Sequence, residues 1–187
     1  MKKFELTAEF VTNVFGKKLF RIKALVAFGN VEKGELGGFI EKEDNLSHDG
    51  NAWVFGNAWV YGNAQVYGNA QVFGNAWVYG NAQVYGNAWV YGNAQVSGDA
   101  RVYGDARVYG DADYAVVKGF GRCFRTTTFF RCKDKILRVQ CGCFYGDLAQ
   151  FREIVKKTHG DSKYAKEYLA IADLMELHFS DECGGEQ

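Results

Sequence analysis

The sequence predicts an all-β protein with a small α+β module: a parallel β-helix with an N-terminal hairpin cap and a C-terminal module of three strands and two helices. One six-residue pattern recurs eleven times from Gly50 to Ala115. Two strand-like segments precede it, and three strand-like and two helix-like segments follow it. We therefore expect a cap over residues 1–49, a β-helix over 50–115 and a module over 116–187.

Nine of the eleven hexads contain glycine, Asn or Asp, alanine, a variable residue, valine and an aromatic residue; one has Ser97 in the aromatic position, and the last has Tyr114 and Ala115 in the valine and aromatic positions. In an extended chain alternate side chains share a side, so alanine and valine point one way and the other two the opposite way. Glycine and Asn or Asp tolerate left-handed backbone angles, so they form the corners. Three hexads then make one coil, and the eleven hexads of the repeat make about 3.7 coils around stacked Ala and Val.

Stacking of successive coils sorts the outward side chains into three unequal faces. Contiguous exposed apolar patches mark binding surfaces, and Trp and Tyr dominate binding hot spots. Six aromatic residues are therefore expected to contact a partner: Trp53, Trp59, Tyr61, Trp77, Tyr79 and Trp89. Two alternatives stay open, because the caps could cover these faces, or the rings could form ladders that only stiffen the column.

The corner residues predict ladders of side-chain amides between coils, since Asn recurs at every sixth position from Asn51 to Asn93. From Asp99 onward the corner residue becomes Asp, and the variable residue becomes Arg at positions 101 and 107. Opposite charges in adjacent columns can pair, so we expect the column to end here with a protected edge.

The flanking segments predict the two ends of the column. Residues 4–28 read as two strands around a turn at residues 16–18, and "GNVEKGELGGFI" reads as a glycine-rich connection. Counting back by six places Ile40 and Leu46 in the alanine column. After the repeat, "YAVVKGF", "RCFRTTTFFRCK" and "KILRVQCGCFYG" read as three strands, followed by helices that begin after Asp147 and near Ser162.

The strands of the C-terminal module are basic: residues 116–140 carry seven basic side chains and one acidic side chain. Guanidinium and hydroxyl groups donate hydrogen bonds to phosphates and other anions. The sequence therefore predicts a candidate anion site at Arg122, Arg125, Thr126, Thr127, Thr128 and Arg131. A nucleotide is one anion that such a site would accept. The alternative is that these strands attract the acidic helices that follow.

Composition limits the partners and the compartment. Lys plus Arg and Asp plus Glu both number 22, so no net field attracts nucleic acid or an anionic membrane, and nucleic acid is an unlikely partner. No signal peptide and no apolar run of membrane-spanning length occurs, which favours a cytoplasmic protein without membrane contact. The five cysteines, Cys123, Cys132, Cys141, Cys143 and Cys183, match no common zinc spacing. We expect free thiols, no metal and no cofactor.

The columns of valine from Val54 to Val108 and of alanine from Ala52 to Ala112 resemble the hexapeptide-repeat, left-handed β-helix proteins. The left-handed winding is implied by this resemblance. The segments "GELGGFIEKEDNLSHDGNAWV", "TTTFFR", "CGCF" and "THGDSKYAKEYL" are similar to uncharacterised, "polymer-forming" hexapeptide-repeat proteins of phages and prophages. That similarity implies a phage-encoded protein acting in the host cell.

Three functions are compatible with these features of the sequence. Many hexapeptide-repeat proteins are acyltransferases that use a histidine as general base, but His48, His159 and His178 all lie outside the repeat. An anti-defence protein that sequesters a signalling nucleotide or anion at the basic strands is the second possibility. We favour a non-catalytic binding scaffold that self-associates, or docks on a host protein, through an aromatic face.

Overall fold

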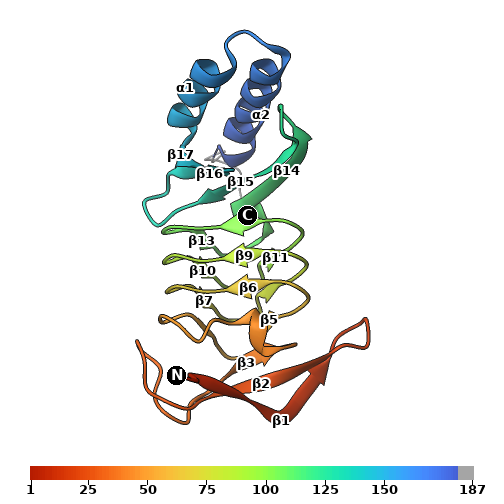
Figure 1. Cartoon of the computed structure of the whole chain (residues 1–187), viewed down its shortest axis with the longest axis vertical. Coiled ribbons are helices and arrows are strands. Elements are labelled where there is room, and N and C mark those ends of the chain that lie inside the picture. Colours follow the sequence, from red (N-terminus) through yellow and green to blue (C-terminus); the bar gives the residue numbers. More distant parts are fainter. Residues whose placement is uncertain (181–187) are drawn as a thin grey trace, which may run out of the picture. The chain divides into compact units, whose positions relative to one another are not determined.

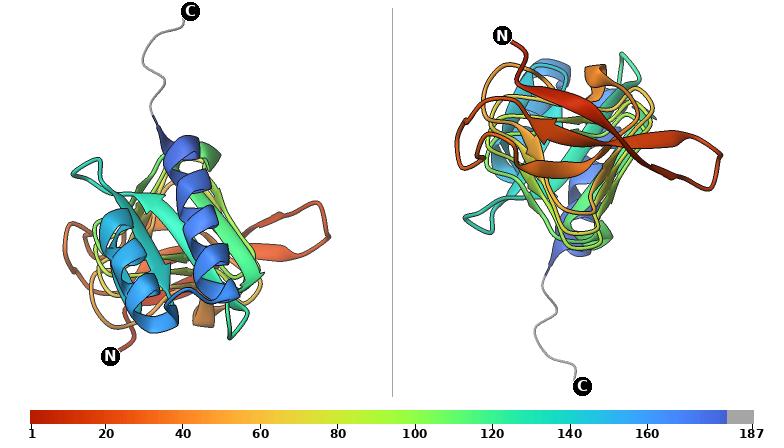
Figure 2. Two further views of the ribbon diagram at one scale, coloured as in Figure 1. Left: turned by 90° about the horizontal axis from the view of Figure 1, so that it is seen from above. Right: turned by 90° about the horizontal axis from the view of Figure 1, so that it is seen from below.

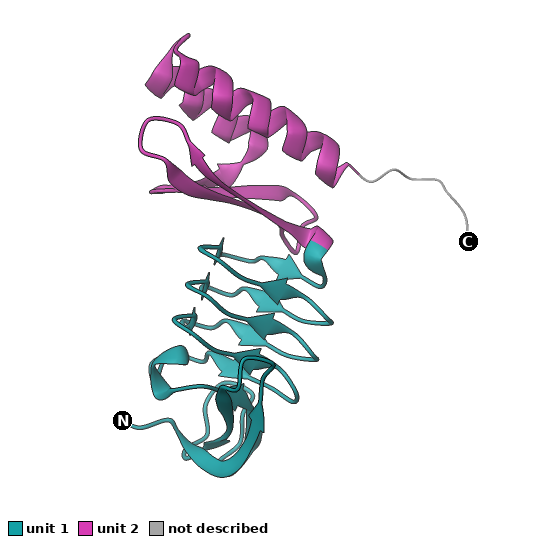
Figure 3. Ribbon diagram, turned by 90° about the vertical axis from the view of Figure 1, so that its right-hand side faces the viewer, with its two compact units in different colours: residues 1–111 teal, residues 112–187 magenta. Residues whose placement is uncertain are grey.

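The computed structural model describes residues 1–180 and divides the chain into two compact units, Met1–Asp111 (unit 1) and Ala112–Gln187 (unit 2) (Figure 3). Unit 1 contains a parallel β-solenoid of about four turns, as the repeat predicts (Figure 1). Its short strands are β4 (Trp53–Val54), β5 (Trp59–Val60), β6 (Gln65–Val66), β7 (Gln71–Val72), β8 (Trp77–Val78), β9 (Gln83–Val84), β10 (Trp89–Val90), β11 (Gln95–Val96), β12 (Arg101–Val102) and β13 (Arg107–Val108).

Strands that are one coil apart in the sequence pair in parallel and form the three sheets of the solenoid. Their orders are β4-β7-β10-β13, β5-β8-β11 and β6-β9-β12. Val54 pairs with Val72, Val72 with Val90, and Val90 with Val108, so these valines stack in one line as predicted. All ten repeat valines, and the alanines from Ala52 to Ala106, are fully buried. The centre of the column is therefore packed with their methyl groups.

Amide ladders run along the corners, which confirms the prediction for Asn. Asn51 donates to Asn69, and Asn69 donates to Asn87, both at 3.2 Å between Nδ2 and Oδ1. At the last rung Asn87 donates to Asp105 at 3.2 Å, and Asn81 donates to Asp99 at 3.0 Å. A carboxylate can only accept, so the change from Asn to Asp ends these two ladders with an acceptor.

The N-terminal segment forms an antiparallel hairpin, β1 (Phe4–Thr12) and β2 (Lys18–Ala24), as predicted. Seen along the column, the hairpin crosses the end of the coils and its tip extends beyond their outline (Figure 2). The segment expected to be a connection contains a third strand, β3 (Leu36–Ile40), which pairs antiparallel with β2 and parallel with β5. The hairpin thereby continues one sheet of the solenoid.

Ile40 and Leu46 were expected in the alanine column, and this prediction is wrong. Ile40 pairs with Val60, and Leu46 bridges to Val66, so both residues extend the valine column. The reason is an interval of eight residues between Leu46 and Val54, where every later interval between column residues is six. A shift of two residues is one full period of the side-chain alternation, so Ile40 and Leu46 still point inward but occupy the valine position instead of the alanine position.

Polar and glycine residues of the N-terminal segment close the first coil. The buried Lys3 donates from Nζ to the carbonyl of Ala52 at 2.8 Å, and the buried Asn45 donates to the carbonyl of Ala64 at 2.8 Å. Gly38 has no room for a side chain, because a Cβ there would lie 2.6 Å from the carbonyl oxygen of Ala58. The hydrogen bonds from Lys3 and Asn45 satisfy backbone carbonyls of the first coil, and Gly38 lets β3 approach that coil closely.

Unit 2 is a four-stranded antiparallel sheet with two helices, one strand more than the sequence predicted. Its elements are β14 (Tyr114–Phe120), β15 (Arg125–Arg131), β16 (Leu137–Cys141), β17 (Phe144–Asp147), α1 (Leu148–His159) and α2 (Lys163–Phe179). The expected third strand is two strands because Gly142, with φ +61°, turns the chain between Cys141 and Cys143. Only glycine adopts that backbone angle without strain, and the turn makes a tight hairpin.

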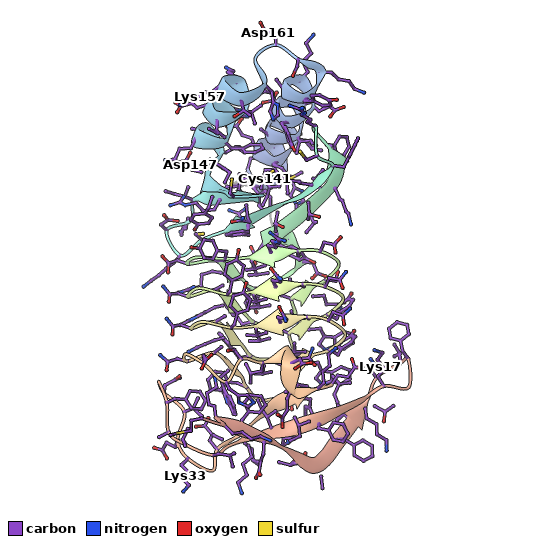
Figure 4. All side chains as sticks on the ribbon, in the orientation of Figure 1. Lys17, Lys33, Cys141, Asp147, Lys157 and Asp161 are labelled. Carbon is purple, nitrogen blue, oxygen red and sulfur yellow. The ribbon has the colours of Figure 1, made fainter. Side chains whose placement is uncertain are left out.

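The two helices lie side by side on one face of this sheet (Figure 2). Asp147 caps α1 as predicted, accepting from the backbone N–H of Gln150 at 2.8 Å (Figure 4). Phe129 and Val139 of the sheet are fully buried against apolar residues of both helices. No helix within residues 1–180 is long and apolar enough to cross a membrane.

Candidate binding surfaces

The six aromatic residues predicted to contact a partner differ widely in exposure. Trp53 is fully buried, packed edge-on against Phe4 and Phe28 with ring centroids 6.2 and 5.3 Å away. The prediction for Trp53 as a partner contact is therefore wrong. It fails because the N-terminal segment covers the first coil of this face, an alternative that the repeat pattern could not decide.

A second sheet of the solenoid carries two ring ladders, which we call the Trp77 face (outward side chains of β5, β8 and β11 and the aromatic residues after them). Trp59 stacks on Trp77 at 4.9 Å, and Tyr61 stacks on Tyr79 at 5.1 Å, both nearly parallel. Tyr61 is buried beneath Leu19 and Phe39 of the hairpin cap. Most of this aromatic surface therefore packs against other rings of the same chain or against the hairpin cap.

The most open aromatic surface is the Trp89 face: the outward side chains of β7, β10 and β13 with Phe73, Tyr91 and Tyr109. Trp89 is 38 % exposed and Tyr109 is 62 % exposed. Phe73 stacks on Tyr91 at 5.0 Å and meets Trp89 edge-on at 5.7 Å, so the rings support one another. Trp89 is the one residue of the six predicted partner contacts whose side chain is exposed.

Arg107 completes the Trp89 face. Its guanidinium lies over the Trp89 ring, 4.2 Å from the centroid, in cation–π geometry. Nη1 also donates to the backbone carbonyls of Asn87 at 3.0 Å and Ala106 at 2.8 Å. The sequence predicted that this arginine would pair with a neighbouring acid at the column's end. The structure instead shows a cation held by ring and backbone.

The third face carries no tryptophan, and its outward rings are Tyr67, Tyr85 and Tyr103. They stack in sequence at 4.8 and 4.5 Å. Burial raises the pKa of Tyr67 and Tyr85, and the neighbouring phenol adds to the rise in each case. This ladder stiffens the column, and none of its rings is among the widely exposed apolar side chains.

An apolar hairpin tip was missed by the sequence reasoning. Val14 is 86 % exposed and Phe15 is 74 % exposed, and both precede Lys17 at the projecting end of the hairpin (Figure 4). The alternation of apolar and charged residues along β1 gave no sign of this, because Val14 and Phe15 lie in the turn. The available signal was the apolar pair Val14 and Phe15 directly before the predicted turn at residues 16–18.

The six predicted anion-binding residues do not form one cluster. Along β15 the side chains alternate, so Thr126 and Thr128 point to the side opposite Arg125, Thr127 and Arg131. Thr127 is buried and donates to Sγ of Cys141 at 3.1 Å. Arg131 donates to the carbonyl of Phe179 at 3.0 Å and lies 3.6 Å from Asp113. The six residues thus split between two surfaces, and only Arg122 and Arg125 stay together.

Arg122 and Arg125 line a cavity of about 350 Å³ in unit 2. The opposite wall comes from α1 and α2, through Phe151, His159 and Tyr168. Burial, with Cys141 beside it, raises the pKa of Tyr168 to about 12. Three cysteines also line this cavity: Cys123, Cys141, marked in Figure 4, and Cys143.

The remaining predicted groups have ordinary surroundings. His48 accepts from the backbone N–H of Lys3 at 3.2 Å and stacks on Phe4 at 4.3 Å, and His178 lies on α2. Cys123, Cys141 and Cys143 are free thiols, Cys132 is buried, and Cys183 lies outside the described residues. Residues 1–180 contain no group of three or more metal-ligating side chains placed to hold an ion.

Comparison with known families supports the repeat architecture. A model described as YdcK beta solenoid repeat matches residues 64–80, 82–98 and 100–112. The three matches begin one coil apart, and together they cover about a quarter of the chain. No curated protein matches the sequence.

Proposed function

We propose that the protein is a non-catalytic binding scaffold whose solenoid self-associates through the Trp89 face. The observation that carries the proposal is the exposed Trp89 ring with the Arg107 guanidinium over it, beside the exposed ring of Tyr109. Trp, Arg and Tyr are the residue types most enriched at the centres of protein interfaces. A solenoid of stacked coils is also a common scaffold for extended binding surfaces.

The contacts of Arg107 make this face suitable for burial in an interface. A cation that loses water is destabilising unless its donors are satisfied. Nη1 of Arg107 already donates to backbone carbonyls, and the Trp89 ring covers one face of its guanidinium. A second molecule could therefore cover Arg107 with a smaller desolvation penalty than a free arginine would carry.

A second copy of this chain is the occupant that the charge favours. The formal net charge is zero, so two copies do not repel each other at long range. The outward rows of this face, Gln71, Trp89 and Arg107 beside Phe73, Tyr91 and Tyr109, contain one charged residue. A two-fold axis would place these rows against their own copies, as in an isologous dimer.

Sedimentation velocity over a range of concentrations tests the proposal. Trp89→Gln is the informative variant, because Gln71, Gln83 and Gln95 occupy the same repeat position in other coils. We expect the dimer dissociation constant to rise at least tenfold, since a central tryptophan contributes roughly 2 kcal/mol or more. Trp77→Gln is the matched control on the Trp77 face and should leave the dissociation constant within threefold.

Two outcomes would contradict this assignment. A wild-type protein that stays monomeric at every concentration excludes self-association. Association that survives Trp89→Gln but disappears in Phe15→Ser places the interface at the hairpin tip, which exposes other apolar residues of unit 1.

A further inference from the structure

The cavity in unit 2 has two guanidinium groups and no acidic side chain. Its lining contains Arg122 and Arg125, and none of its lining residues is Asp or Glu. The other three arginines of unit 2 pair with carboxylates: Arg138 with Asp134, Arg152 with Asp173 and Glu176, and Arg131 with Asp113. Within residues 1–180, Arg122 and Arg125 form no such ion pair, so their charge is available to a ligand.

The opposite side of the cavity is aromatic. Phe151 and Tyr168 are buried, with centroids 5.7 Å apart and rings nearly perpendicular. Phe144 contacts Phe151 at 5.6 Å, and His159 lies 5.9 Å from Tyr168. The phenol of Tyr168 does not repel an anion, because a tyrosine is neutral near pH 7 and burial raises the pKa of this one further, to about 12.

The loop that carries Arg122 is held in an unusual conformation. Phe124 has φ +50°, a left-handed angle that a non-glycine residue adopts only with strain. The backbone N–H of Gly121 donates to Glu167 on α2 at 2.8 Å, and the phenol of Tyr168 donates to the carbonyl of Phe120 at 3.4 Å. Gly142 supplies space on the other side, since a Cβ there would collide with Nη1 of Arg125. These contacts fix the backbone of the loop that carries Arg122 beside the first residue of β15, Arg125.

We propose that this cavity binds a small aromatic anion, with its phosphate or carboxylate between Arg122 and Arg125 and its ring against Phe144, Phe151 and Tyr168. The volume of about 350 Å³ lies within the range of small-molecule sites, which are mostly apolar with a few polar groups that fix orientation. Two guanidiniums bind a phosphate or carboxylate by charge-assisted, often bidentate hydrogen bonds. This site is separate from the Trp89 face and does not depend on self-association.

Isothermal titration calorimetry of the full chain tests this proposal with probes that separate ring from anion. Adenosine 5′-monophosphate and phenyl phosphate carry both groups, benzoate replaces phosphate with carboxylate, and adenosine and inorganic phosphate each lack one group. We expect the compounds with both groups to bind at least tenfold more tightly than adenosine or inorganic phosphate. The ranking of phenyl phosphate against benzoate identifies the preferred anion.

Charge-matched double variants identify the residues. Arg122→Gln with Arg125→Gln should weaken the binding of the best probe at least tenfold. Lys133→Gln with Lys135→Gln removes the same charge from exposed residues of another turn and should leave binding unchanged. If both double variants weakened probe binding equally, the weakening would come from the loss of overall positive charge, and the proposal would be overturned. It would also be overturned if none of the probes bound.

Alkylation of the thiols that line the cavity measures ligand binding by a second method, independent of calorimetry. Cys123 and Cys143 are exposed cavity residues, whereas Cys132 is buried and lies outside the cavity. Saturating adenosine 5′-monophosphate should slow iodoacetamide labelling of Cys123 and Cys143 at least threefold, measured by mass spectrometry of each peptide. Labelling rates that do not change with ligand would place any bound probe elsewhere and contradict the assigned site.

Discussion

Unit 1 and unit 2 bury their apolar side chains in different ways. In the coils, a buried valine such as Val72 pairs with the valines one coil before and one coil after it, so the core repeats with the sequence. In unit 2, Phe129 packs with residues from β16, α1 and α2, and no sequence period links them. A column built from neighbour contacts confines the effect of one replacement, whereas a shared core spreads it through the whole unit.

The largest expected effect is in the shared core. Phe129→Ala should lower the free energy of unfolding of unit 2 by about 3–5 kcal/mol, because Phe129 is fully buried between sheet and helices. Hydrogen exchange measured by mass spectrometry should accelerate across residues 112–180 and stay unchanged in the coils. Leu174→Ala is the control, since Leu174 is 56 % exposed. Acceleration of equal size in the coils would contradict the division into two units.

A corner glycine should have a smaller effect. Gly86 has φ +72°, and a Cβ there would lie 2.9 Å from the backbone nitrogen of Gly104 in the next coil. Gly98 has φ +64° with nothing within 4 Å of such a Cβ. Gly86→Ala should cost roughly 2–3 kcal/mol in a chemical denaturation, and Gly98→Ala about 1–2 kcal/mol from backbone strain alone. Equal losses would show that close stacking of the corners adds nothing.

The two units should also respond oppositely to alkaline pH. Burial lowers the pKa of Lys3 in unit 1 from 10.5 to about 8, although nearby Asp49 partly offsets this. Between these values the unfolded chain binds more protons, so stability should rise with pH by on the order of 1–2 kcal/mol after allowance for solvent screening. Tyr168 in unit 2 has a pKa raised to about 12, so the folded state binds more protons above pH 10, and stability should then fall.

Denaturation of the Lys3→Met variant isolates the first of these terms. The wild-type protein and this variant are compared at intervals from pH 7 to pH 10, and the difference between their unfolding free energies should change through this range. A difference that stays constant would contradict the burial of a charged Lys3.

The smallest expected effect is in the amide ladder. Asn69 accepts from Asn51 and donates to Asn87, so Asn69→Ala removes two exposed hydrogen bonds. We expect a loss of about 1 kcal/mol in the free energy of unfolding, measured by urea titration. Gln65→Ala alters an exposed outward side chain of the neighbouring hexad and should change stability by less than about 0.5 kcal/mol. If Asn69→Ala lowered the free energy of unfolding by no more than Gln65→Ala does, the ladder would contribute nothing measurable to stability.

The features of the fold that could be predicted from the sequence are mainly those set by the six-residue repeat. The buried column, the amide ladders and the three faces follow from a six-residue repeat, and the capping role of Asp147 follows from local residue type. The positions of Ile40 and Leu46 were wrong because two additional residues precede Val54 and break the period. The extra strand of unit 2 was missed because its turn contains one glycine within an apolar run.

The candidate sites were less predictable because they depend on contacts between distant segments. Nothing near Trp53 in sequence indicates that Phe4 and Phe28 cover it. Local composition grouped Arg125, Thr126 and Thr127, whereas strand alternation places Thr126 on the opposite side of β15 and helix packing brings Phe151 of α1 to the cavity that Arg125 lines. Periodicity thus predicts which side of the chain faces out, and tertiary packing decides which outward side chains stay exposed.

Hydroxyl-radical footprinting at increasing protein concentration tests the proposed interface most directly, because it reads individual rings in the unmodified chain. Oxidation of Trp89 and Tyr109 should fall at least threefold as the protein associates, while oxidation of Tyr67 and Tyr103 on the third face stays constant. Oxidation of Trp89 and Tyr109 that does not depend on concentration, in a sample shown to be associated, would contradict self-association through this face.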